Sequence, residues 1–236
     1  MCDHRGVSEP ASPSITCVIP TRDSIAYLEE AIESVLIQSP PVPELLVVDA
    51  GSTDGTRELV ESYGPPVELV TRPGGPAVAR QHGLERARGE FISFLDSDDA
   101  YLPGKQARQL ERFSARPELE ICMCHAEMFW EPGLGDEEAR YRAAGRHRGA
   151  YLFQTMLARR QVFEKVGPIG PELNIGDVVD WMARARDAGA VIEVLDDVLV
   201  RRRMHPASLT HRTPSLDRYV EVVKARLDRV RASNTR

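Results

Sequence analysis

The chain has 236 residues, 42% of them hydrophobic, which suits one large domain or a domain with a small appendage. A net charge of −6 and a pI near 5.6 exclude a general nucleic-acid binder. No apolar run approaches membrane-spanning length, and residues 1–14 lack the apolar core that a signal peptide needs.

The cysteine pattern argues against a zinc site. The four cysteines are Cys2, Cys17, Cys122 and Cys124, and no second close pair accompanies the last two. Because a structural zinc site needs about four ligands, we expect buried free thiols. A reduced cytoplasmic protein fits this usage best.

The first half alternates strands with helices. Short apolar runs predict strands at residues 15–19, 45–48, 67–70 and 91–95, and amphipathic stretches predict helices at 25–36, capped by Ser24, at 56–63 and at 77–87. This βαβαβαβ order specifies a parallel sheet with helices on both faces.

The second half is less regular. We expect a helix at 105–113, a strand or strand pair at 119–129, a mobile polar loop at 131–148, a return to the sheet at 151–157, helices at 161–166 and 177–188, short strands at 191–194 and 198–200, and a terminal helix at 216–231. With no internal repeat and no clear linker, we expect one domain, preceded by a disordered tail at 1–13.

Three carboxylates follow the apolar strand at 91–95. They belong to Asp96, Asp98 and Asp99. Such charge at the mouth of a buried strand needs compensation, and ligands bind at the carboxyl ends of strands in open α/β sheets. Oxygen ligands of this kind predict a Mg²⁺ or Mn²⁺ site that holds substrate phosphates. The alternative is a solvated turn that caps the helix beginning near Pro103.

Several segments together resemble the family 2 glycosyltransferases of the GT-A fold. In chain order they are VIPT at 18–21, VVDAGSTDGT at 47–56, ARQHGL at 79–84, FLDSDD at 94–99, FEKVG at 163–167, DVVDW at 177–181 and RMHP at 203–206. The resemblance covers about residues 14–212. It implies a single-domain α/β GT-A fold at 14–236, with a mostly parallel central sheet and helices on both faces. A nucleotide-binding half would span about 14–100 and an acceptor-binding half about 101–212.

The resemblance also implies an activity and a set of donor-site residues. A family member moves a sugar from a nucleotide diphosphate sugar, here expected to be a UDP-sugar, to an acceptor hydroxyl, with Mn²⁺ or Mg²⁺ and with inversion. Ala50 departs from the family's usual acidic pair and leaves the nucleobase open, and Asp54 is read as a helix cap. The implied nucleotide-sugar contacts are Pro20, Thr21, Asp49, Arg80, Asp96, Asp98 and Arg203, with a plain surface arginine as the alternative for Arg80. The implied metal ligands are Asp98, Asp99 and His205, in the DxD motif and a late Arg-x-His element.

The catalytic base is expected at the start of the helix predicted at 177–188. The resemblance places an acidic residue there, and Asp177 is preferred over Asp180 because it aligns with the helix start. An inverting displacement needs such a carboxylate to take the proton of the acceptor hydroxyl. The alternative is a capping box made by the same two residues.

Two other functions stay open. A non-catalytic nucleotide- or sugar-binding module could keep the fold without turnover, and a methyltransferase is faintly matched by Asp49-Ala50-Gly51 after a strand. The expected partners are a nucleotide-sugar donor and an acceptor that the sequence does not identify, with no nucleic acid. Peripheral contact with a membrane and the oligomeric state are left open.

Overall fold

The computed structural model describes residues 14–145, 148–170 and 176–208. The predicted tail at 1–13 and the predicted helix at 216–231 lie outside these ranges. Among the described residues, no helix has the length and apolar character needed to cross a membrane.

The first half forms the predicted parallel sheet. Its elements are β1 (Ile15–Thr21), α1 (Leu28–Leu36), β2 (Glu44–Asp49), α2 (Thr56–Tyr63), β3 (Val67–Thr71), α3 (Pro76–Arg86) and β4 (Phe91–Phe94). The strands lie in the order β3-β2-β1-β4, and each neighbouring pair is parallel. Consequently β1, β2 and β4 all end at the same edge of the sheet.

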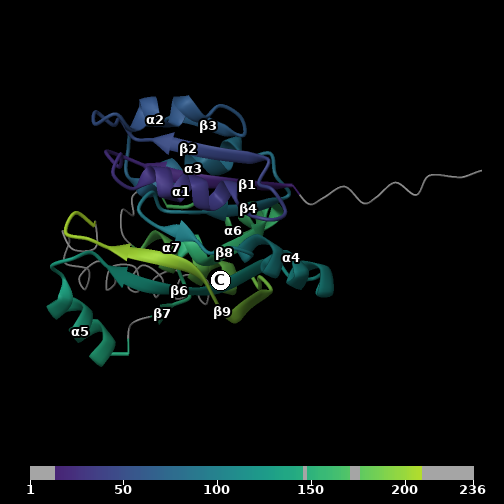
Figure 1. Cartoon of the computed structure of the whole chain (residues 1–236). Coiled ribbons are helices and arrows are strands. Elements are labelled where there is room, and N and C mark those ends of the chain that lie inside the picture. Colours follow the sequence, from purple (N-terminus) through teal and green to yellow (C-terminus); the bar gives the residue numbers. More distant parts are fainter. Residues whose placement is uncertain (1–13, 146–147, 171–175, 209–236) are drawn as a thin grey trace, which may run out of the picture.

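The second half extends the same sheet with mixed pairing. Its elements are β5 (Ala100–Tyr101), α4 (Lys105–Ala115), β6 (Ile121–Trp130), α5 (Gly135–Ala143), β7 (Arg148–Gly149), a short 3₁₀ turn η1 (Phe153–Thr155), β8 (Met156–Arg159), α6 (Arg160–Val166), α7 (Asp177–Asp187) and β9 (Ile192–Met204). The described residues form one nine-stranded sheet that continues from β4 as β8-β6-β9-β5, with β7 on β6. In Figure 1, α2 and β3 lie at one end of the molecule, while β6, β9 and α5 lie at the other.

Two apolar cores cover the two faces of the sheet. Along β2, Leu45 and Val47 face one core and Leu46 and Val48 the other, as the period of a strand requires. Helices α1 and α4 contribute to the first core, and α3, α6 and α7 to the second. The free thiols among the described residues, Cys17, Cys122 and Cys124, are all buried, as predicted.

One glycine brings α3 unusually close to the sheet. A Cβ on Gly83 would overlap Cγ1 of Val18 and would lie 3.2 Å from Cγ2 of Val48. Only glycine fits there, because the lack of a Cβ lets the backbone of α3 pack directly on β1 and β2.

The prediction of a mobile loop at 131–148 is wrong, because much of this segment is the helix α5. Acidic residues occupy its first turn and Arg140 and Arg142 its last, which complements the helix dipole. Glu138 pairs with Arg142 one turn later at 2.8 Å, and the rings of Trp130 and Tyr141 meet at 5.8 Å between centroids. These local contacts fix a segment that composition alone marked as mobile.

Two smaller predictions also need correction. The strands expected at 191–194 and 198–200 are one strand, β9, whose residues 195–197 lie in an irregularity of its pairing with β6. A bulge therefore accommodates the polar residues that suggested a break. Ser24 is not the side-chain cap of the first helix, because α1 begins at Leu28 and the hydroxyl of Ser24 contacts Arg22 and Ser97 instead.

Candidate functional site

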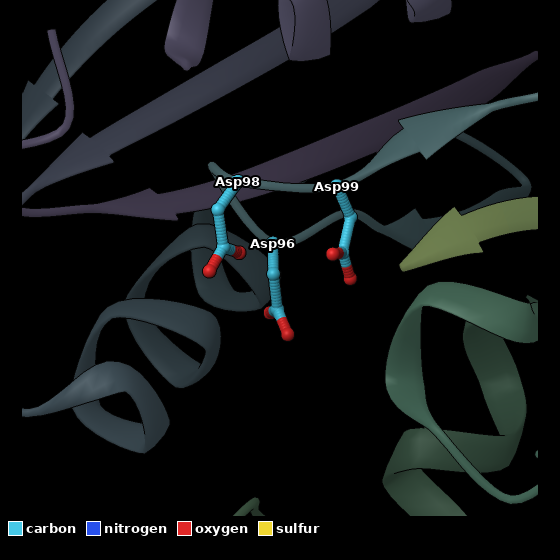
Figure 2. A group of neighbouring side chains, drawn as sticks. All are labelled: Asp96, Asp98 and Asp99. Atoms are coloured by element: carbon cyan, nitrogen blue, oxygen red, sulfur yellow. The ribbon is translucent and has the colours of Figure 1, made fainter. Parts of the chain in front are cut away.

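The three aspartates after β4 cluster as predicted. Each of Asp96, Asp98 and Asp99 offers an oxygen within 4.8 Å of the others. Figure 2 shows the three carboxylates leaving one loop toward the same side. They do not cap the following helix, because α4 begins after Gly104, with no side-chain capping bond. The capping alternative is therefore wrong.

Asp99 differs from its two neighbours because both its oxygens already accept hydrogen bonds. Oδ1 accepts from the backbone N–H of Arg203 at 2.9 Å, and Oδ2 accepts from Nε2 of Gln154 at 2.8 Å. Burial, together with the charges of Asp98 and Asp96, raises the pKa of Asp99 well above its ordinary range. Asp99 thus joins β9 to the acidic loop, and its two hydrogen bonds fix the orientation of its carboxylate.

Asp98 and His205 meet across 107 residues of sequence. Nε2 of His205 lies 3.0 Å from Oδ2 of Asp98. Nδ1 of His205 is buried and has no partner among the described residues. The imidazole packs against the ring of Tyr27 with centroids 4.6 Å apart. Since His205 directly follows β9, that strand determines its approach to the acidic loop.

Arg203 lies beside this pair, at the end of β9. Its Nε donates to the carbonyl oxygen of Asp98 at 3.2 Å, and its guanidinium forms ion pairs with Glu30 and Glu131. The guanidinium also stacks over Tyr27, 5.0 Å from the ring centroid. The guanidinium of Arg203, which is predicted to contact a diphosphate, therefore lies at the acidic loop, where Glu30 from α1 and Glu131 after β6 hold it.

The residues predicted to contact the nucleobase and the ribose lie at the ends of β1 and β2. Pro20 and Thr21 finish β1, and Thr21 pairs with Asp49 of β2. The hydroxyl oxygen of Thr21 is buried and has no hydrogen-bond partner among the described residues. Asp49 is fully buried, and its oxygens accept from the backbone N–H groups of Gly51 and Ser52. Its carboxylate shapes the loop after β2.

Asp54 is not the N-cap of α2, which is Gly55, although its side chain still supports the start of that helix. Oδ1 accepts from the backbone N–H of Thr56, the first residue of α2, at 3.1 Å. Oδ2 accepts from the backbone N–H of Ile25 at 3.0 Å. Burial opposes ionisation of Asp54, but these hydrogen bonds outweigh it and lower its pKa. Asp54 lies one residue before the N-cap, Gly55, and supports both the helix start and the loop before α1.

Arg80 is buried, which excludes the surface alternative. Its Nη1 donates to Oδ2 of Asp177 at 2.7 Å, and its Nη2 pairs with Oδ1 of Asp96. Burial works against the charge, but Asp96 and Asp177 outweigh it and raise the pKa of Arg80. The side chain thus connects the acidic loop with the start of α7.

Asp177 and Asp180 occupy the first turn of α7 without forming a capping box. The N-cap is Gly176, whose φ of 85° is left-handed, and it makes no side-chain capping bond. Oδ1 of Asp177 accepts from the N–H of Val178 at 2.9 Å, while Oδ2 of Asp180 accepts from Nε of Arg184 at the same distance. Of the two carboxylates, the bridge through Arg80 links Asp177 to the acidic loop.

Sequence reasoning missed four side chains that support this site. Gln154 fixes Asp99, Tyr27 packs on His205, and Glu30 and Glu131 pair with Arg203. Each acts across at least 55 residues or across separate elements, so no local pattern marks it.

Comparison with known proteins identifies the family. The sequence matches glycosyl transferase family 2 over residues 16–167, which is more than half of the chain and spans β1 to α6. The chain belongs to glycosyl transferase family 2. The family 2 match includes the acidic loop and Arg80, whereas α7 and β9 lie beyond it.

Relatives of this family 2 chain differ in how much they share with it. An uncharacterized glycosyltransferase of Rickettsia prowazekii, RP339, is 35% identical over 214 residues, covering 85% of this chain and 67% of that protein. TuaG of Bacillus subtilis, named for teichuronic acid biosynthesis, is 39% identical over 104 residues. That match spans 42% of this chain and only 41% of TuaG.

Solved structures confirm the GT-A fold. TarS of S. aureus, in a complex with UDP-GlcNAc, superposes with a TM-score of 0.63 over 83% of this chain and 60% of that chain, at 22% identity. The likeness at this identity establishes the architecture, a mixed α/β fold with one curled sheet.

Proposed function

We propose that this family 2 chain transfers a sugar from a UDP-sugar to an acceptor hydroxyl, with a divalent cation and with inversion at the sugar. The observation that carries the proposal is the convergence of Asp98, His205 and the Arg80–Asp177 pair beside the ends of β1 and β4. Crevices at the carboxyl ends of strands are where α/β folds bind nucleotides. The UDP-GlcNAc complex of TarS supports a uridine nucleotide as donor.

The donor set fits Mn²⁺ or Mg²⁺. Carboxylate oxygens suit both ions, and an imidazole nitrogen is compatible with Mn²⁺. Asp98, Asp99 and His205 would hold the ion, because Nε2 of His205 lies 3.0 Å from Oδ2 of Asp98 and the carboxylate of Asp99 belongs to the same cluster. When bound, the cation supplies Lewis-acid stabilisation of the departing diphosphate.

The chain's own residues would bind and orient the two substrates. Thr21, which pairs with Asp49 at the end of β1, would contact the nucleoside, and Asp96 would contact the ribose. The positively charged guanidinium of Arg203, which lies beside Asp98, would contact the diphosphate. Asp177 would accept the proton of the acceptor hydroxyl, and Asp180 is the second candidate for this step.

Isothermal titration calorimetry and a donor-hydrolysis assay test the proposal. We expect UDP with Mn²⁺ to bind, S-adenosylmethionine not to bind, and at least one nucleotide sugar to be hydrolysed slowly without acceptor. Nucleotide binding without release of sugar from any donor would favour a non-catalytic module. Binding of S-adenosylmethionine in place of UDP would favour a methyltransferase.

Asparagine substitutions separate the two base candidates. Asp177→Asn should lower turnover by roughly 10² or more while UDP affinity stays within about threefold, because it removes the base and keeps the shape. Asp180→Asn is the matched comparison on the same helical turn. A larger loss in Asp180→Asn than in Asp177→Asn would transfer the role to Asp180.

A further inference from the structure

One arginine joins carboxylates from opposite halves of the chain. Arg80 lies on α3. Asp96, in the loop after β4, is sixteen residues beyond Arg80 in the sequence, and Asp177, the first residue of α7, is ninety-seven residues beyond it. The two ends of one guanidinium contact the two carboxylates, Nη1 that of Asp177 and Nη2 that of Asp96. A planar guanidinium fixes the spread between its partners more rigidly than an ammonium does.

The protein leaves this guanidinium little freedom. The side chain of Arg80 is 9% exposed and that of Asp177 is 8% exposed. The centroid of the Phe153 ring lies 5.3 Å from Cζ of Arg80. At Gly83, on the same helix as Arg80, α3 packs closely against β1 and β2. A buried charge that left its partners would lose its compensation, so the pair keeps its place.

We infer that Arg80 is a positioning residue that aims Asp177 at the acceptor and ties it at a set distance to the donor loop through Asp96. The inference rests on the proposed function, because it requires Asp177 to be the base. Oδ2 of Asp177 is held by Arg80 and Oδ1 by the N–H of Val178, so the carboxylate has one orientation. Misplacement of a reacting group by about 1 Å costs about 10² in rate, which makes such fixing useful.

The charges around Asp177 agree with this role. Burial raises the pKa of Asp177, and the positive charge of Arg80 opposes that rise. Among the described residues, Arg80 from α3 and Asp96 from the loop after β4 are the charged groups that influence it. A general base must be unprotonated to act, and Arg80 favours that state.

The alternative is a buried ion pair that only stabilises the fold. In that case, replacing Arg80 would lower turnover only as far as it lowers the folded fraction. Its effect would also be independent of the group at position 177 in the catalytic step. A double-mutant cycle with Asp177 separates the two readings.

The experiment compares Arg80→Gln, Arg80→Lys, Asp177→Asn and the double variant Arg80→Gln/Asp177→Asn. Arg86→Gln is the control, because Arg86 lies on the same helix and pairs with Glu68 at the surface. Each variant is measured for kcat, donor KM, UDP affinity with Mn²⁺ and thermal unfolding. Arg80→Lys keeps the charge and is the variant to use if Arg80→Gln fails to fold.

We expect Arg80→Gln to lower kcat by about 10² and donor KM to change by less than about fivefold. The double variant should be no slower than Asp177→Asn, within about threefold, because Arg80 acts through Asp177. Arg80→Lys should recover most of the unfolding temperature but not kcat, since one ammonium cannot meet both carboxylates as a guanidinium does. Wild-type kcat in Arg80→Gln or Arg80→Lys, or multiplicative losses in the double variant, would overturn the inference.

Failure of the proposed function gives a different result. A wild-type protein that binds UDP but turns over no donor refutes the proposed activity on its own. The thermal part of the cycle then still tests the bridge. Non-additive shifts in unfolding temperature for positions 80 and 177 support it, and additive shifts refute it.

Discussion

Substitution of Gly83 by alanine should damage activity more than stability. The added Cβ would overlap Cγ1 of Val18 and would lie 3.0 Å from its Cγ2, inside a buried contact between α3 and β1. Overpacking of this kind costs about 1–3 kcal/mol, while alanine favours the helix by about 1 kcal/mol over glycine. The expected net loss is therefore about 0–2 kcal/mol, which lowers the unfolding temperature by up to about 8 °C.

The larger effect should appear in turnover. Relief of the overlap moves α3 away from the sheet, and Arg80 lies on the same helix, one turn before Gly83. A displacement of about 1 Å at Arg80 would carry Asp177 with it and lower kcat by about 10². Scanning calorimetry and steady-state kinetics on Gly83→Ala measure both quantities in one preparation.

A compensating substitution tests the reasoning directly. Val18→Ala removes the two nearest of the three methyl groups that a Cβ at position 83 would meet, so Gly83→Ala/Val18→Ala should regain most of the lost kcat. Val18→Ala alone should lose stability, by about 1.6 kcal/mol for two methyl groups, and keep near-normal kcat. Wild-type kcat in Gly83→Ala, or no recovery in the double variant, would refute the argument.

Two further predictions concern the metal and a buried lysine. Asp98→Ala should weaken Mn²⁺-dependent UDP binding at least about tenfold by calorimetry. Its fold should survive because the Asp98 side chain is 29% exposed, and full wild-type activity in EDTA would contradict the metal assignment. Lys105 is fully buried, and burial lowers its pKa from the ordinary 10.5. Between the lowered pKa and 10.5 the unfolded chain binds more protons, so this lysine makes stability rise with pH, by at most about 1.4 kcal/mol per pH unit. Urea unfolding at a series of pH values that ends near 10.5 should show a smaller rise in stability in Lys105→Met than in wild type, and equal slopes up to that pH would count against a lowered pKa.

The predictable part of the fold follows from short-range patterns. Strands β1, β2 and β4 are continuous apolar runs of the kind buried on both faces of a parallel sheet, and the acidic cluster directly follows one of them. Strand direction alone then places Asp49 and Asp96 at one edge. The helix α5 could also be predicted from the sequence, because Glu138 and Arg142 have the spacing of a helical ion pair.

The rest depends on contacts that no local pattern encodes. Gln154 reaches Asp99 across fifty-five residues, and Arg80 reaches Asp177 across ninety-seven. In the sequence, nothing distinguishes Gln154 or Arg80 from an ordinary surface residue, because only the folded sheet brings each of them to its partner. The same holds for Asp99, whose two hydrogen-bond donors, Arg203 and Gln154, come from distant segments of the chain.

The shared guanidinium also limits how this sequence can evolve. Loss of Arg80 alone leaves the carboxylates of Asp96 and Asp177 uncompensated, and breaking a buried ion pair costs about 3–5 kcal/mol. Loss of Asp177 alone leaves half of the guanidinium without its partner. Single replacements at either position should therefore be selected against, and a paired replacement would restore the charge balance but not the carboxylate proposed as the base. Homologues that lack a carboxylate at the position of Asp177 should tend to lack the arginine as well, so the two positions are inherited as one unit.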